Sequence, residues 1–274
     1  MVARSRLLQH IRHDLHVYRI SLWINIRAAA VLRGALITQI VGMVFNNACF
    51  LAAWLFFFGK FGTVNGWSAI DYIGLGALQS LLFGLVSFLV VGCMDIPRHV
   101  DSGSLDAFLT KPMSVLGNIA SSNVDLTTIG DMIFGAVLLA WYVMHVHVGL
   151  AAMGMFMVAV LSAMIIFFCF AMLLPNVIAF YVFDSEKLSR YAGVLFLDSG
   201  LYPTGVLSGP LRAIFTFAIP AILFAAVPIK VLHGMEWQWV GIGAAVAIFW
   251  LIVTLWLFKR ALRKYESANL IGAR

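Results

Sequence analysis

Long apolar segments alternate with short polar ones along the chain, at the length that a membrane-spanning helix requires. About 20 apolar residues, rising about 1.5 Å each, cross a hydrocarbon core of roughly 30 Å. Segments of this length lie at 34–58, 72–94 and 126–146, from about 150 onward, and at 211–232 and 238–258. The pattern predicts an all-α polytopic membrane protein with six transmembrane helices, folded as a single domain over residues 1–274.

The apolar stretch 150–183 is too long for one upright span. Its 34 residues would form a helix of about 51 Å. Pro175, followed by Asn176, can interrupt the helix because proline lacks a backbone N–H. We expect the part after Pro175 to bend along the inner membrane interface.

Two further segments mix apolar and charged residues in the manner of helices that lie on a membrane surface. Residues 1–33 combine Trp23 and aliphatic residues with six arginines, which predicts an amphipathic N-terminal interface helix. In the segment 184–210, Leu188 and Leu195 fall on one helical face, which predicts a second interfacial segment.

Composition and charge agree with a membrane protein and give it an orientation. The chain is 62% hydrophobic and only 11% charged, so the bilayer must serve as solvent for most of it. With both termini in the cytoplasm, the inner segments hold sixteen of the eighteen Lys and Arg residues, and the outer loops hold Lys60 and Lys230. The net charge of +6 therefore indicates contact with membrane lipids rather than nucleic acid.

No motif in the chain predicts an ATP site, a hydrolytic centre or a metal site. The sequence contains no G-x-x-x-x-G-K-[ST], no H-E-x-x-H and no G-x-S-x-G. We therefore expect no catalytic residue, metal or cofactor on this chain.

Polar residues inside the apolar segments are the candidates for a solute pathway. Gln39 and Asn46 lie seven apart on nearly one helical face, and Asn47 follows. Asp131 falls within the third segment, where an ionisable group is costly unless it faces a bundle interior or a wet cavity. These residues either line a path or tie helices together. Gly76, Ser80 and Gly84 form a small-residue face suited to close helix packing.

The inner loop 95–114, "DIPRHVDSGSLDAFLTKPMS", predicts a short helix charged on one side and apolar on the other. Asp106 lies near its positive N-terminal end, and Leu105, Phe108 and Leu109 share a face. Pro112 is expected to end the helix.

This loop resembles the one between the second and third spans of ABC exporter permeases of the type-2 class. The matching basic, glycine, leucine, leucine and proline positions are Arg98, Gly103, Leu105, Leu109 and Pro112. A second region resembles the Tyr-Pro, Pro-Leu-Arg and spaced-proline pattern of one bacterial subfamily, with Tyr202, Pro203, Pro210, Arg212, Pro220 and Pro228.

The resemblance implies an exporter permease in the bacterial cytoplasmic membrane whose ATPase is a separate subunit. The short inner helix would then be a coupling helix that docks on that ATPase through Arg98, Gly103, Leu105, Asp106, Phe108, Leu109 and Pro112. ATP and magnesium would bind the partner, and a second permease subunit, identical or related, would complete the translocation path.

Two other functions stay open at this stage. An intramembrane lipid-modifying enzyme could use Asp125 and Asp131 as paired carboxylates. An ATP-independent channel or scaffold would need no ATPase partner. The transported substrate is not identified by any residue cluster in the sequence.

Overall fold

The computed structural model describes residues 2–31, 33–64, 66–111, 113–146, 148–201, 209–234 and 237–265, with side chains from Arg12 onward except that of residue 225. The described part is helical and contains no strand, which confirms the predicted all-α class. The helices are α1 (Val2–Ala29), α2 (Arg33–Phe61), α3 (Ala69–Val90), η1 (Val91–Asp95), α4 (Ile96–Asp101), α5 (Asp106–Leu109), α6 (Val115–Ala120), α7 (Thr128–Val146), α8 (Leu150–Phe167), η2 (Phe168–Leu173), η3 (Pro175–Phe180), α9 (Glu186–Gly200), α10 (Gly209–Ala213), η5 (Ile214–Ala218), α11 (Ala221–Leu232) and α12 (Trp237–Leu262).

Five helical paths within the described residues are long and apolar enough to cross a membrane. They are Arg33–Phe61, Ala69–Asp101, Thr128–Val146, Leu150–Phe180 and Trp237–Leu262. Each contains or overlaps one of the predicted spans.

The remaining predicted span, 211–232, is not one continuous helix, so the count of six is not confirmed. Its helical path breaks at Ile219, whose φ of −124° and ψ of 81° are not helical, and at Pro220, which supplies no backbone N–H. Pro228, in contrast, lies inside α11 without ending it. The remaining helix α11 has only 12 residues.

The long apolar stretch after residue 150 follows a single helical path whose winding changes twice. The α-helix α8 passes directly into the π-helical segment η2, and Pro175 then begins the 3₁₀ segment η3. Pro175 therefore begins a tighter helix on the same path, and the predicted bend along the inner membrane interface stays a prediction.

Helices α3 and α7 pack closely along their length because glycines remove the side chains between them. A Cβ atom on Gly84 would lie 2.9 Å from the backbone nitrogen of Met132. On the other helix, a Cβ atom on Gly135 would lie 2.6 Å from the Ala77 carbonyl oxygen. The predicted close-packing face of α3 is thus confirmed at Gly84, with Gly135 as its counterpart on α7.

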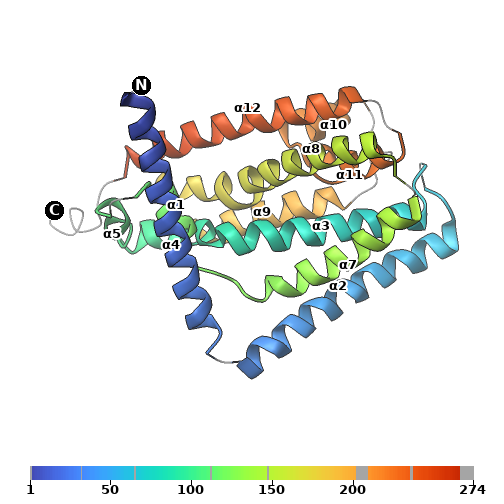
Figure 1. The fold of residues 1–274 in the computed structure, drawn as a ribbon, viewed down its shortest axis with the longest axis horizontal. Coiled ribbons are helices and arrows are strands. Elements are labelled where there is room, and N and C mark those ends of the chain that lie inside the picture. Colours follow the sequence, from blue (N-terminus) through green and yellow to red (C-terminus); the bar gives the residue numbers. More distant parts are fainter. Residues whose placement is uncertain are drawn as a thin grey trace.

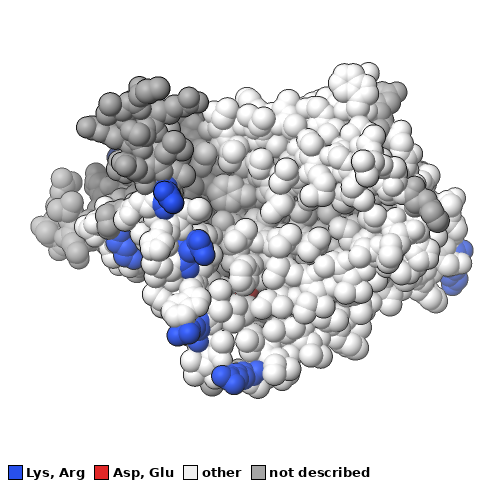
Figure 2. Space-filling view, viewed as in Figure 1, with Lys and Arg blue, Asp and Glu red and all other residues white. Residues whose placement is uncertain are grey.

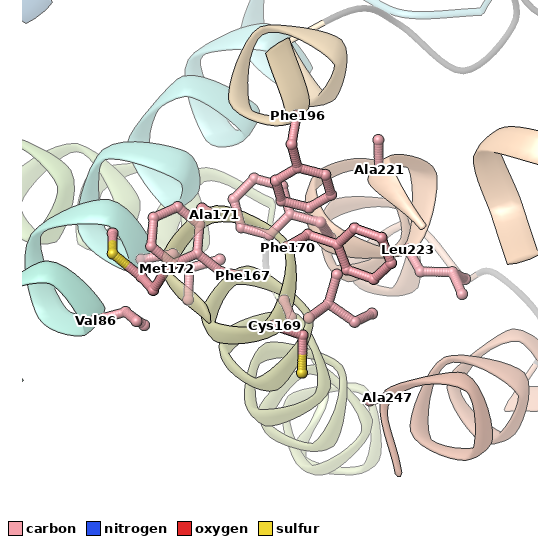
Figure 3. Packing of buried hydrophobic residues seen from close by; sticks show 14 of the residues in the cluster. Val86, Phe167, Cys169, Phe170, Ala171, Met172, Phe196, Ala221, Leu223 and Ala247 are labelled. Carbon is pink, nitrogen blue, oxygen red and sulfur yellow. The ribbon is translucent and has the colours of Figure 1, made fainter. Parts of the chain in front are cut away.

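The main hydrophobic core lies where α8 and η2 meet α3, α9, α11 and α12. Phe170 of η2 stacks on Phe196 of α9 with ring centroids 5.3 Å apart, and Phe167 stacks on Phe224 at 5.5 Å. Figure 3 shows Phe196 projecting from α9 toward Phe167 and Phe170. This packing fixes α9 against the long helices.

Helices α1 and α9 take different directions. In Figure 1, α1 runs crosswise to the long helices at one end of the molecule, whereas α9 runs alongside them. Residues 2–29 of the predicted interface segment are thus helical, and its location on a membrane surface stays a prediction. The last turns of α9 lie beside the middle of α3, where Gln79 donates a hydrogen bond of 3.0 Å to the Leu197 carbonyl. The remainder of the segment 184–210, at 202–208, lies outside the described residues.

Candidate functional site

A polar cavity of about 290 Å³ lies between the middle of α2, the middle of α3, the first turns of α7 and the last turns of α9. Three of the four predicted pathway residues line it: Asn46, Asn47 and Asp131. Gln79 and Ser80 of α3 and Asp198 of α9 add further polar groups. The structure therefore gathers residues as far apart in the sequence as Asn46 and Asp198 around one space.

The carboxylate of Asp131 is held on one side only. Asn47 donates a hydrogen bond of 2.6 Å to Asp131 Oδ1, which joins α2 to α7. Asp131 is only 3% exposed, yet its Oδ2 atom has no hydrogen-bond partner among the described residues. The same holds for the Oε1 atom of Gln79, which is 8% exposed and donates its amide hydrogen to Leu197. Three residues that line the cavity, Gln79, Ser80 and Asp131, thus each have a buried oxygen atom without a hydrogen-bond partner among the described residues.

Gln39 does not lie at this cavity. It is exposed on α2, two turns before Asn46, in the part of α2 that diverges from the other long helices in Figure 1. That Gln39 lines a translocation path therefore stays a prediction.

Asp125 and Asp131 have different hydrogen-bond partners. Asp125 Oδ1 accepts hydrogen bonds from the backbone N–H of Thr127 at 2.9 Å and from its hydroxyl at 2.6 Å. This local turn leads into α7, so Asp125 shapes the chain at that point. Asp131 instead accepts from Asn47, so the two carboxylates are held by different parts of the chain.

The predicted coupling loop is a compact projection built from α4 and α5. Gly103 adopts a φ of +72°, which an L-residue with a side chain adopts only at a cost, and so makes the turn between them. The Leu105 N–H then donates to the His99 carbonyl at 3.1 Å, and the His99 ring lies 4.7 Å from that of Phe108. Pro112 lies outside the described residues.

The apolar face of this loop points into the protein rather than outward. Leu105 is fully buried and Phe108 is 8% exposed, and both belong to the main core, whereas Leu109 is 44% exposed. The expectation that all three present one surface to a partner is therefore wrong in its geometry. The outer surface of the loop is formed by Arg98, Ser102, Ser104, Ala107, Leu109, Thr110 and Lys111, with Asp106 half-buried.

Helix α1 forms hydrogen bonds with the chain on both sides of this loop. The Tyr18 hydroxyl donates to the Leu89 carbonyl at the end of α3. Asn25 donates to the Ser121 carbonyl at 2.7 Å, and the Ser114 N–H donates to Asp14 Oδ2 at 3.3 Å. The N-terminal helix thus contacts both sides of the projection.

A second polar cluster, Asp71 with Tyr142 and His233, lies at the opposite ends of the helices and was not found from the sequence. His233 Nε2 lies 2.7 Å from Asp71 Oδ1 and 2.6 Å from the Tyr142 hydroxyl. Asp71 also forms a reciprocal capping box with Ser68 at the start of α3. The cluster joins the ends of α3, α7 and α11.

Comparison with known families identifies the class of protein. A family model described as "ABC-2 family transporter protein" matches residues 17–269, which is most of the chain. The chain belongs to the ABC-2 transporter family. The resemblance drawn from the inner loop is therefore confirmed. No curated protein and no solved structure gives a significant match.

As an ABC-2 protein, the chain is a multi-pass membrane component of a transporter and is not itself catalytic. Sequence reasoning missed Gln79 and Asp198 at the cavity. Gln79 could have been noticed as an amide in the middle of an apolar segment, but its partner Leu197 lies 118 residues away.

Proposed function

We propose that this ABC-2 permease is the membrane subunit of an ATP-driven exporter, coupled through the α4–α5 loop to a separate ATPase subunit that binds ATP and magnesium. The observation that carries the proposal is the helical path Ala69–Asp101. It holds Gln79 at the polar cavity near its middle and ends at the projecting loop. A movement of the loop is thereby transmitted along one helical path to the cavity.

The loop is suited to receive such a movement. Leu105 and Phe108 anchor it in the core, so it moves with the helices rather than independently of them. Its outer surface offers Leu109 beside polar groups and the cation Lys111, a mixture that suits a contact with a soluble protein. Closure of an ATPase dimer against this surface would tilt the long helices and change the access to the cavity.

The charge distribution supports a cytoplasmic position for this loop and for both termini. In Figure 2, Lys and Arg atoms gather mainly along the end of the molecule where α1 lies in Figure 1, with a further patch at the opposite end, and the broad middle of this face shows none. A cationic end next to an apolar band is typical of a cytoplasmic membrane boundary. With this orientation, residues 209–232 make the fifth of six crossings as two short helices, and α1 lies in the inner interface.

A second permease subunit completes the path in this proposal. Gln39 and Asn46 are exposed on α2, within a helix long enough to span the membrane. Amide side chains that face lipid tails leave their hydrogen-bonding groups unsatisfied, which is costly. A second copy packed against this face of α2 would cover them and would place two polar cavities near one axis.

The coupling contact is tested by substituting the exposed leucine of the loop. We expect Leu109→Asp to reduce both the amount of ATPase subunit that co-purifies and the ATP turnover of the complex, because it places a charge in the contact. The thermal unfolding midpoint should stay unchanged, since Leu109 is partly exposed. Leu105→Asp should instead prevent folding, because it buries an unpaired charge in the core.

Leu150→Asp is the matched control. Leu150 is the first residue of α8, is highly exposed and lies far from the loop, and a carboxylate is favourable at a helix N-terminus. Equal ATPase recovery and turnover in Leu109→Asp and Leu150→Asp would show that the loop does not couple the two subunits.

A further inference from the structure

The cavity between α2, α3, α7 and α9 is acidic and has no cation of its own. Its described lining contains two carboxylates, Asp131 and Asp198, and no Lys, Arg or His. Figure 2 shows acidic atoms only as a small patch set within the otherwise uncharged middle of this face. A carboxylate at such a position normally has a cationic or hydrogen-bonding partner.

The open acceptors at the cavity specify what the missing partner must supply. Asp131 Oδ2 and Gln79 Oε1 are buried acceptors without donors among the described residues. Leaving such atoms unpaired destabilises the folded protein, and more so for a charged group. The other polar atom of each side chain is already paired, because Asp131 Oδ1 accepts from Asn47 and Gln79 Nε2 donates to the Leu197 carbonyl. A ligand that brings positive charge or hydrogen-bond donors would satisfy both groups, whereas an anion would be repelled.

Aromatic rings form much of the remaining wall. Phe50 of α2, Phe83 of α3 and Phe134 of α7 line the cavity together with the polar residues. The face of an aromatic ring attracts a cation, and this attraction strengthens where water is excluded. Carboxylate and aromatic groups together favour an organic cation over a strongly hydrated metal ion, because metal ions prefer several oxygen ligands.

Helix α9 adds a further favourable field. It ends at Gly200, and its last turns contribute Leu197 and Asp198 to the cavity wall. The C-terminal end of an α-helix carries a partial negative charge, which stabilises a nearby cation. The helix end and both carboxylates therefore all favour a cation in the cavity.

We propose that this cavity binds a small organic cation, a molecule with an ammonium group, as the recognised part of the transported substrate. The inference rests on the proposed transport function and deepens it by naming a substrate class. A cavity of about 290 Å³ is near the lower end of ligand-sized pockets, which suits a small amine. The ammonium lies against Asp131 and Gln79, and the alkyl groups contact Phe50, Phe83 and Phe134.

The test compares two ligands of the same shape that differ in charge. The permease–ATPase complex in nanodiscs is titrated with choline and with dimethylbutanol, the uncharged carbon analogue of choline, while thermal unfolding is recorded. A ligand that binds only the folded state raises the unfolding midpoint with concentration. We expect choline to raise the midpoint and dimethylbutanol to have no effect; equal effects of the two, or no effect of choline, would overturn the inference.

Two variants locate the binding. Asp131→Asn keeps the shape of the side chain and should raise the choline concentration for the half-maximal shift at least about tenfold. Glu186→Gln removes an exposed carboxylate that pairs with Arg190 outside the cavity and should leave the shift unchanged. An undiminished shift in Asp131→Asn would move the site elsewhere and overturn the assignment. If this variant does not fold, the comparison of choline and dimethylbutanol on the unchanged protein still tests whether the protein binds the cation.

The outcomes separate this inference from the proposed function. Loss of the choline effect with normal ATPase recovery and turnover would refute the cation site and leave the transporter proposal standing. If no ATPase subunit co-purifies, the coupling proposal fails, and the choline titration of the chain alone still decides whether the cavity binds cations.

Discussion

Gly135 of α7 lies against the backbone of α3, so an alanine at this position tests how tightly these two helices are joined. Its Cβ atom would lie 2.6 Å from the Ala77 carbonyl oxygen and 2.8 Å from the Leu81 Cα atom. The Leu81 backbone nitrogen would lie closer still. Ordinary van der Waals contacts begin at 3.4 Å, so the helices must separate by at least about 0.8 Å. All three obstacles are backbone atoms, which no change of side-chain rotamer can move.

The expected loss of stability follows from two opposing terms. Overpacking a close contact costs typically about 1–3 kcal/mol, and a clash with rigid backbone belongs at the upper end of that range. Alanine in place of glycine inside a helix returns about 1 kcal/mol. The net loss is about 2 kcal/mol, which lowers the unfolding midpoint of a chain of this size by about 4–8 °C.

Gly154→Ala on α8 is the control, because a Cβ atom there would have no neighbour within 4 Å. It should leave the midpoint unchanged or raise it by a few degrees, since only the helix-propensity term remains. Thermal unfolding of both variants in nanodiscs, followed by tryptophan fluorescence, measures the difference. Equal midpoints for Gly135→Ala and Gly154→Ala would refute the close approach of α3 and α7.

Two further predictions concern the subunit interface and the N-terminal helix. If α2 faces a second copy, mild oxidation should link the exposed Cys49 residues of two copies into a disulfide dimer. On a denaturing gel, Cys49→Ser should stay monomeric. If the unchanged protein, oxidised in membranes, also runs only as a monomer, α2 does not face a second copy. Burial, and secondarily the nearby Cys93, raises the pKa of Tyr18 from 10.0 to about 12. Because folding favours the neutral phenol, the contribution of Tyr18 to stability is complete below pH 10 and is lost as the pH rises to about 12. In unfolding measurements over this range, Tyr18→Phe should therefore lose less stability than the unchanged protein. Equal losses in the two proteins would contradict the burial of Tyr18.

Much of the fold could be predicted from the sequence because the bilayer imposes a simple rule on helix length. The apolar segments at 34–58 and 238–258 correspond to α2 and α12 within a few residues. The same rule could not distinguish Pro220, where the helix breaks, from Pro228, which α11 accommodates. Neighbouring helices can satisfy the backbone groups that a proline frees, and the sequence does not show which neighbours are present.

The site was predictable in part for a related reason. An ionisable Asp131 and an amide Asn47 within apolar segments indicate a polar interior, and the structure joins them by a hydrogen bond. The direction of the loop residues Leu105 and Phe108 was not predictable. An apolar face at helical spacing is required equally for docking on a partner and for burial in the chain's own core, so periodicity alone could not decide between them.

The π-helical segment η2 sets the rotational phase of everything that follows it in the fourth long helical path. A π-turn holds one more residue than an α-turn, so the extra residue rotates the next segment by about 100° relative to an unbroken α-helix. Pro175 and the 3₁₀ segment face their present neighbours only because of this offset. Deletion of one residue between Phe168 and Leu173 would therefore leave the segment just as apolar. It would nevertheless rotate the following part of the helix, so that the wrong side faces α9.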